Sequence, residues 1–351
     1  MLKITLKTKM TMNMSMNENK SRILEIWSEM ECLKQDGFYK RLYESNKPFH
    51  IYGTYDFSNR FYGIGFIISN GFRIDIDHFS NLKDLKVTFT TDTSFENSRL
   101  LSIQLLDTYS KDVFAVLCEN LIQSVIDSPS EKKRIRTVIN QLEKWKTMFD
   151  KINSEGLTTA QQQGLFGELH FLEKFLSCRD VVPNDALHTW VGVDADLRDF
   201  QGTNWAVEVK TSATNNPQSV KINGERQLDE TLLDTLFLYH CSVEVSKSNG
   251  QSLPQKIAKI RERLINDNIA LNNFNAKLFE VGYVDRQEHL YYNRCYQIRN
   301  ENFYHINDDF PRIKENELRK GVGNVKYSIV LQMCNEYLVP ENLVLNTIKS
   351  I

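Results

Sequence analysis

WAVEVKTS, residues 205–212, alternates apolar and charged side chains in a run rich in β-branched and aromatic residues. This pattern is typical of a short β-strand. Because successive side chains of a strand point to opposite faces, Glu208 and Lys210 share one face, and the apolar residues between them share the other. We expect the apolar face to enter a core. Two charged groups in such a strand are costly to bury unless something pairs them, so they are candidates for chemistry.

The tripeptide Glu-x-Lys is weak evidence by itself. It occurs three times in the chain, and the copies that begin at Glu18 and Glu131 lie in polar runs. An ion pair at an exposed sheet edge would explain Glu208 and Lys210 equally well, and it contributes only about 0–1 kcal/mol. Only the setting of the third copy distinguishes it.

A turn-like segment, QGTN at 201–204, precedes the strand. Asp199 stands before this segment, so Asp199 and Glu208 would lie on two arms of a β-hairpin, where cross-strand neighbours can meet. Two carboxylates about 4 Å apart repel by ~1 kcal/mol in water and ~4 kcal/mol at an effective dielectric of about 20. A divalent cation reverses this sign, and hard oxygen ligands suit Mg²⁺ or Mn²⁺. The carbonyl of Val209 could add a ligand, and Lys210 could position or activate water and offset developing charge.

Asp199, Glu208 and Lys210 resemble the motif of the PD-(D/E)XK nuclease superfamily, which has the restriction-endonuclease-like fold. The sequence departs from the motif at Arg198, which stands where the motif has proline. Asp196 is the alternative first metal ligand, because its surroundings also resemble the start of such a hairpin.

The resemblance extends to a narrower bacterial family, called PD-(D/E)XK motif proteins, which resemble components of phage-defence and restriction-like operons. It covers about Trp27 to Val330 and includes Gly164–Leu169, Trp190-x-Gly192, Glu208-Val209-Lys210, Gln227-Leu228 and Phe310–Ile313. It implies that Glu168 assists the metal site and that Gln227 orients the substrate or the water at the metal. A capping or salt-bridged Glu168 and a surface Gln227 are the alternatives.

Size and composition indicate a globular protein. Of 351 residues, 41% are hydrophobic and 25% charged, and the net charge is −2. This charge excludes a generally basic surface, so nucleic acid would be held by a local patch or by a partner. The six cysteines form no CxxC pair and the seven histidines no HExxH motif, which argues for reduced thiols and against a zinc hydrolase. We expect no membrane span and no signal peptide, and hence a cytoplasmic protein.

The order of patterns predicts an α/β (α+β) protein. We expect a disordered extension at 1–20, an N-terminal α+β domain at 21–153 that ends in a helical connector, and a nuclease-like domain at 154–351. The first domain would contain an antiparallel β region within 49–106. The second would be a mixed sheet flanked by helices, with a β-rich C-terminal extension. Its expected elements are a helix from Thr158, strands at 219–223, 232–245 and 277–284, and helices that begin at Gln227 and Leu253.

Within the helix from Thr158, Gln161 would complete a capping box. Gly164 and Gly167 each cost about 1 kcal/mol relative to alanine, which close approach to a sheet would justify.

Together these patterns and the resemblance predict a Mg²⁺- or Mn²⁺-dependent endonuclease that hydrolyses phosphodiester bonds. DNA as the substrate, operon-encoded protein partners and a defence role are implied by the resemblance alone. A homodimer would allow a double-strand cut, because one metal centre serves one strand. The alternative is a catalytically silent or partner-dependent nucleic-acid-binding or assembly subunit of a defence complex, which the near-neutral charge favours.

Overall fold

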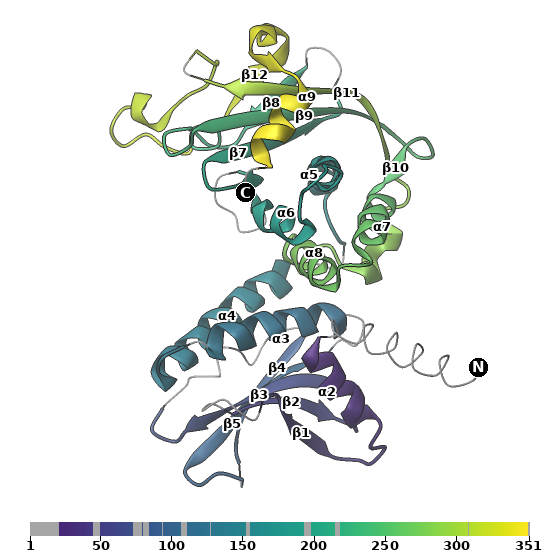
Figure 1. Ribbon diagram of the computed structural model, residues 1–351, viewed down its shortest axis with the longest axis vertical. Coiled ribbons are helices and arrows are strands. Elements are labelled where there is room, and N and C mark those ends of the chain that lie inside the picture. The colour runs from purple at the N-terminus through teal and green to yellow at the C-terminus, as the bar shows by residue number, and fades with distance from the viewer. Residues whose placement is uncertain are drawn as a thin grey trace, which may run out of the picture. The chain divides into compact units, whose positions relative to one another are not determined.

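The computed structural model describes residues 21–44, 50–72, 79, 84–92, 94–106, 111–126, 128–151, 155–192, 198–214, 218–307 and 309–349. The chain divides into two compact units, Met1–Asn153 and Ser154–Ile351 (Figure 1). The extension expected at 1–20 lies outside the described residues. The domain boundaries expected at 21–153 and 154–351 stay a prediction.

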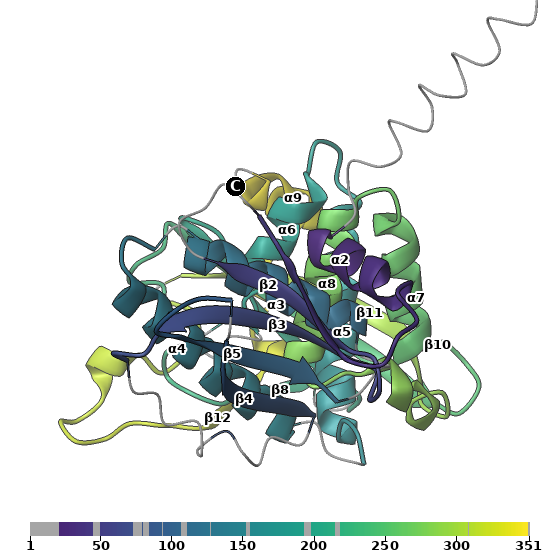
Figure 2. The ribbon, with the colours of Figure 1, turned by 90° about the horizontal axis from the view of Figure 1, so that it is seen from below.

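Unit 1 is an antiparallel sheet with helices. Its strands run in the order β1-β2-β3-β5-β4, and each neighbouring pair is antiparallel. β2 to β5 (Figure 2) lie within residues 49–106, as predicted, whereas β1 lies before that region. The indole N–H of Trp27 donates to the carbonyl of Gly63 at 2.8 Å, which holds the first helix on the sheet. The elements are α2 (Arg22–Glu31), β1 (Phe38–Leu42), β2 (Ile51–Asp56), β3 (Phe61–Ser69), β4 (Leu85–Thr91), β5 (Ser98–Leu105), α3 (Lys111–Ile126) and α4 (Glu131–Lys151).

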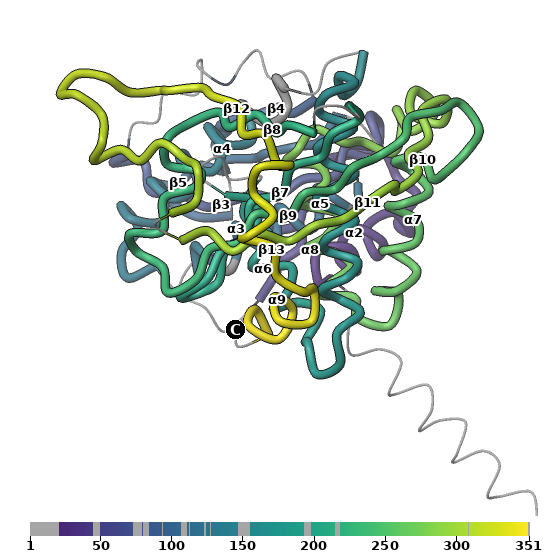
Figure 3. The backbone as a smooth tube through the Cα atoms, turned by 90° about the horizontal axis from the view of Figure 1, so that it is seen from above, coloured from purple at the N-terminus to yellow at the C-terminus, as the bar shows by residue number. Residues whose placement is uncertain are grey.

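Unit 2 is built on a mixed sheet in the order β10-β11-β9-β7-β6, with β13 added beside β11. β7 and β9 are parallel, and the other pairs are antiparallel. The strands are β6 (Phe200–Gln201), β7 (Trp205–Ser212), β9 (Thr235–Ser246), β10 (Gln251–Ser252), β11 (Cys295–Ile306) and β13 (Leu338–Val339). β8 (Ser219–Ile222) and β12 (Tyr327–Val330) form a separate antiparallel pair (Figure 3).

Helices flank this sheet, and α5 lies along β7 (Figure 1). The helices are α5 (Thr159–Leu176), α6 (Pro183–Thr189), α7 (Leu253–Leu264), α8 (Asn268–Glu280) and α9 (Glu341–Ile348), with short 3₁₀ segments at Asp285–Leu290, Glu315–Glu317, Leu331–Met333 and Asn335–Tyr337. A mixed sheet flanked by helices, together with the antiparallel unit before it, confirms the predicted α/β (α+β) class.

β7 separates two clusters of buried side chains. Trp205, Val207 and Val209 pack in the cluster that includes the apolar stripe of α5, which confirms the predicted apolar face. Ala206 belongs to the second cluster, on the opposite face. Glu208 alternates with Val207 and Val209 and therefore lies on the Ala206 face.

Two predicted elements of unit 2 are wrong. Residues 277–284 are not a strand, because Lys277 lies in the last turn of α8 and a turn follows that helix. Ala270, Phe274 and Leu278 are buried at helical spacing, and this stripe outweighs the short apolar run that resembles a strand. Gln227 does not begin a helix either. It lies in a turn, where its N–H donates to the carbonyl of Gly224 at 3.3 Å.

The start of α5 is as predicted. The hydroxyl of Thr158 accepts from the N–H of Gln161, and the Gln161 side chain accepts from the N–H of Thr158 at 2.9 Å. A Cβ atom on Gly167 would lie 1.7 Å from Oγ1 of Thr211, so the missing side chain lets α5 approach β7 closely. Around Gly164 a Cβ atom would meet nothing within 4 Å, so close approach there was a wrong prediction.

Replacing each of the two glycines by alanine should therefore change the free energy of unfolding in opposite directions. Gly167→Ala should lower the free energy of unfolding by about 1–3 kcal/mol, because either Thr211 or the helix must move. Gly164→Ala has open space and should raise it by about 0.5–1 kcal/mol through helix propensity. Urea denaturation of both variants measures the difference. Equal effects would contradict the close contact between α5 and β7.

Candidate active site

Asp199 is fixed at the base of the β6–β7 hairpin. Phe200 pairs with Val207 in this hairpin, and Asp199 directly precedes β6. Oδ2 of Asp199 accepts a hydrogen bond from the N–H of Val209 at 2.7 Å. The carbonyl of Asp199 accepts from the N–H groups of Val191 and Gly192, each at 3.0 Å. Both its backbone and its side chain are thus held against β7.

The carbonyl of Val209 shares the edge of β7 that carries Asp199. In a strand, the N–H and the C=O of one residue point to the same side. Because the N–H of Val209 bonds to Asp199, its C=O also points away from β9 and toward the β6 side. A backbone oxygen is therefore present where the sequence predicted a third oxygen ligand.

Glu208 and Lys210 form a buried ion pair. Nζ of Lys210 lies 2.6 Å from Oε1 of Glu208, and the two side chains are 15% and 1% exposed. Nζ also donates to Oε1 of Gln227 at 3.3 Å, and the N–H of Asn223 donates to the same oxygen at 2.8 Å. Oε2 of Glu208 is buried and has no hydrogen-bond partner among the described residues. An exposed edge pair does not describe this arrangement, in which burial makes both charges costly.

Glu168 reaches the same place from α5. The indole N–H of Trp190 donates to Oε2 of Glu168 at 2.8 Å. A Cβ atom on Gly192 would lie 3.0 Å from Oδ1 of Asp199 and 3.5 Å from Oε2 of Glu168, so only glycine leaves these oxygens unobstructed. Glu168 is in the middle of α5 and therefore caps nothing. Its carboxylate faces Asp199.

Burial raises the pKa of all three carboxyl groups, and repulsion by neighbouring carboxylates adds to this for Glu208 and Glu168. Burial and the charge of Asp199 raise the pKa of Glu208 to about 8, against the opposing effect of Lys210. Burial and the charge of Asp199 also raise the pKa of Glu168 well above its ordinary value. Burial raises the pKa of Asp199, although Lys210 and the N–H of Val209 oppose it. Burial favours neutral Lys210, but the charges of Glu208 and Asp199 outweigh this and raise its pKa. A positive charge bound at this site would stabilise the ionised carboxylates.

The donor set fits a hard divalent cation. The unpartnered Oε2 of Glu208 is a buried acceptor that lacks a donor, and Asp199 and Glu168 lie within Coulombic range of it. Carboxylate and carbonyl oxygens are the ligands that Mg²⁺ and Mn²⁺ prefer. Within the described ranges, no group of three or more His, Cys, Asp and Glu side chains is already spaced to hold a metal ion. To become a metal ligand, Glu208 would have to use its unpartnered Oε2, or give up the contact of Oε1 with Lys210 in favour of the ion.

The predicted site residues thus come together, from α5, the β6–β7 hairpin and the turn after β8. Asp196 lies outside the described residues, so the question whether Asp196 or Asp199 is the first metal ligand stays open. Sequence reasoning missed the role of Trp190 as the hydrogen-bond donor to Glu168, although Trp190-x-Gly192 was part of the family pattern. It also missed Arg198, whose charge acts on Glu208 and whose guanidinium donates to the carbonyl of Asp229.

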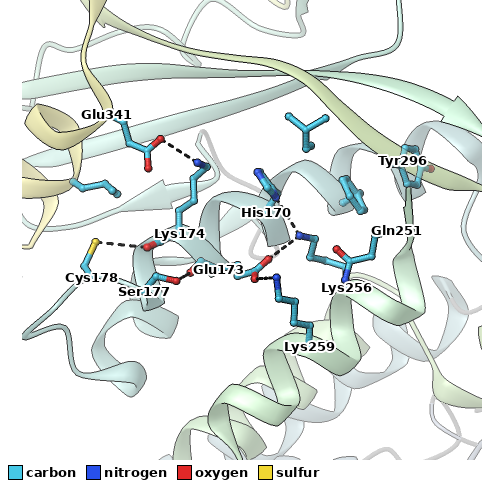
Figure 4. A pocket seen from close by; sticks show the side chains of 13 residues that line it. His170, Glu173, Lys174, Ser177, Cys178, Gln251, Lys256, Lys259, Tyr296 and Glu341 are labelled. Carbon is cyan, nitrogen blue, oxygen red and sulfur yellow. Dashed lines mark hydrogen bonds and ion pairs between the residues drawn. The ribbon is translucent and has the colours of Figure 1, made fainter. Parts of the chain in front are cut away.

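A separate pocket of about 520 Å³ lies on the other side of α5 (Figure 4). His170 lines it and is two residues from Glu168, which places the two side chains about 200° apart around the helix. Nζ of Lys256 lies 2.7 Å from Oε2 of Glu173 and 3.1 Å from Nδ1 of His170, and Lys259 pairs with Glu173 at 2.6 Å. These charges compensate one another, and the described lining contains none of the predicted site residues.

Comparison with known families gives one result. A family model described as "Putative PD-(D/E)XK family member, (DUF4420)" matches residues 23–332. No curated protein and no solved structure matches the chain. None of the described helices combines the length and the apolar composition of a membrane span.

The buried carboxyl groups make the stability of the metal-free protein depend on pH. In the metal-free protein, burial and the charge of Asp199 raise the pKa of Glu208 from 4.5 to about 8, so its ion pair with Lys210 becomes fully charged only above that pH. Between these values the folded state binds more protons than the unfolded state, so the free energy of unfolding should fall as pH rises, by up to about 1.4 kcal/mol per pH unit. Glu208→Gln cannot ionise and should show a shallower slope in urea denaturation with EDTA.

Glu262→Gln is the matched control, because Glu262 is an exposed carboxylate on α7. It should leave the slope as it is in the wild type. If Glu208→Gln also leaves the slope unchanged, Glu208 is not protonated in the folded protein, and the assignment of the raised pKa is wrong.

Proposed function

The chain belongs to the DUF4420 family of PD-(D/E)XK proteins, and from this premise we propose that it is a metal-dependent endonuclease that hydrolyses phosphodiester bonds of DNA. The observation that carries the proposal is the burial of Glu208 beside Asp199, with Lys210 as its only charged partner at hydrogen-bond distance among the described residues. A structural ion pair does not need two further carboxyl groups beside it, both of them half-buried. A cation site does.

Asp199, Glu208 and the carbonyl of Val209 would hold the ion, which is Mg²⁺ or Mn²⁺. Such an ion supplies Lewis-acid stabilisation to phosphodiester hydrolysis when it is bound. In hydrolysis the oxygen of water bonds to phosphorus, the bond from phosphorus to the leaving sugar oxygen breaks, and that oxygen gains a proton. The chain must therefore orient water and stabilise negative charge on the phosphate.

Lys210 is the residue that would stabilise this charge. Its ammonium group is held by Glu208 and by Oε1 of Gln227, so it is fixed before a substrate binds. If Asp199 and Glu208 held such an ion, Lys210 would be the side chain that offsets negative charge on the phosphate. Gln227 would then orient it as a positioning residue. Glu168, held by the indole N–H of Trp190, can accept or return a proton beside Asp199.

The second candidate is a subunit that acts only inside a multi-protein complex. The net charge of −2 favours it, because DNA gains little from a near-neutral surface and a partner could supply the basic groups. We place either form in the cytoplasm, with operon-encoded proteins as the partners. Cleavage that appears only after the neighbouring gene products are added would favour this candidate.

For the wild-type protein we expect cleavage of plasmid or single-stranded DNA in the presence of Mg²⁺ or Mn²⁺ and none with EDTA. Lys210→Ala should slow cleavage by at least about 100-fold, because the preorganised charge is lost. Lys247→Ala is the matched control, since Lys247 is exposed in the turn after β9. Gel electrophoresis of the products measures both. Cleavage by Lys210→Ala at the wild-type rate would remove Lys210 from the mechanism.

Metal binding can be measured without activity. Calorimetry should detect Mn²⁺ binding to the wild type, and Glu208→Gln should weaken it by at least about tenfold, because a charged ligand becomes neutral. Glu262→Gln should bind Mn²⁺ as the wild type does. No Mn²⁺ binding by the wild type would favour the assembly subunit over the nuclease.

A further inference from the structure

A polar cavity of about 510 Å³ lies beside the proposed active site. Its walls are the turn that follows β8 and the loop that precedes β12. The carboxylate of Glu225 joins these walls, because it accepts from the N–H groups of Asn324 at 3.3 Å and Val325 at 2.9 Å. Gln227 lines the cavity, and its Oε1 also accepts a hydrogen bond from the ammonium group of Lys210. An occupant of the cavity would therefore lie next to a phosphate bound near Lys210.

The lining suits hydrogen bonding to the edge of a planar ring. Asn223, Gln227 and Asn324 contribute three side-chain amides, and none of the described lining residues is aromatic. Because Oε1 of Gln227 accepts from Lys210 and from the N–H of Asn223, its amide is held in one orientation. The side-chain amides of Asn223 and Asn324 make no hydrogen bonds in the part of the chain that the structure describes. Amide groups place a donor beside an acceptor, as base edges require.

The concave shape indicates how a base would be presented. Base edges in a DNA duplex lie at the floor of grooves and are read by elements that project into them. A hollow instead accepts a base that has left the stack, in a single strand or by flipping. A volume of about 510 Å³ is within the usual range of about 300–1,000 Å³ for small-molecule sites.

Arg226 could hold the strand that carries this base. Its guanidinium forms two hydrogen bonds with the carboxylate of Glu315, at 2.9 and 2.7 Å, and both side chains are at least half exposed. An exposed pair of this kind contributes little to stability, so the guanidinium can exchange Glu315 for a phosphate group at small cost.

We propose that this cavity binds an unpaired nucleobase of single-stranded DNA beside the phosphate that is cut, and reads its edge with the amides of Asn223, Gln227 and Asn324. The proposal rests on the nuclease function and names its substrate class. In this proposal Asn223 and Asn324 determine the base preference, and Arg226 contacts the phosphate backbone of the DNA strand.

The test measures binding separately from cleavage. Fluorescence anisotropy of labelled oligo-dA, oligo-dC and oligo-dT strands and of a duplex of equal length gives affinities for the full-length protein, with Ca²⁺ in place of Mg²⁺. We expect single strands to bind at least about tenfold more tightly than the duplex, because a duplex must first unpair the base, and we expect the three strands to differ by about fivefold or more. Arg226→Ala should weaken all strands alike and reduce the salt dependence.

The double variant Asn223→Ala/Asn324→Gly removes two of the three amides and should reduce the differences among the strands to about twofold or less. Glycine suits position 324 because its φ is 56°, and alanine at 223 keeps the backbone N–H that bonds to Gln227. Asn266→Ala, at an exposed turn after α7, is the control and should keep the preference.

Equal affinity for duplex and single strands, or a base preference of unchanged size in the double variant, overturns the proposal. The same strands incubated with Mg²⁺ test the nuclease function independently. Base-dependent binding without cleavage rejects the nuclease function alone, and cleavage without base-dependent binding rejects the cavity alone.

Discussion

The site depends on one constraint: the buried carboxyl group of Glu208 and the half-buried carboxyl groups of Asp199 and Glu168 lie around one ammonium group. Glu208 is held on a strand between two cores, Asp199 is tied to the next residue of that strand, and Glu168 arrives from a helix packed against it. Each contact is made by a rigid element, so the carboxylates cannot simply turn toward water. The carboxylates repel one another in the folded protein, and this repulsion contributes to the raised pKa values of Glu168 and Glu208. A bound cation would relieve the repulsion, which favours cation binding.

The close packing of α5 on β7 is what makes this possible. Gly167 removes the side chain that would keep the helix away from Thr211, and Glu168 is the next residue. Trp190, whose backbone pairs with Phe200, donates its indole N–H to the carboxylate of Glu168. A helix capped by Thr158 and fixed by its apolar stripe therefore sets the position of one carboxylate relative to a hairpin that is more than twenty residues away in the chain.

The features of this site that could be predicted from sequence are those that depend on local pattern. Alternation along 205–212 gave the faces of β7, the turn residues gave the hairpin, and Thr158 with Gln161 gave the start of α5. The features that could not be predicted depend on contacts distant in sequence. A short apolar run near Lys277 is compatible with a strand and with the end of a helix, and the burial of one face of α8 selects the helix. The turn around Gln227 and the inward position of Arg198 likewise depend on neighbours that no local pattern reveals.

The central claim is that a divalent cation belongs among these carboxylates. A crystal of the protein grown with Mn²⁺ tests it most directly, through the anomalous difference map. The account predicts a peak in contact with Asp199, Glu208 and the carbonyl of Val209, with the Lys210 ammonium displaced from Oε1 of Glu208 or with the ion on Oε2. An ordered site without a peak, with Lys210 still paired to Glu208, would contradict it.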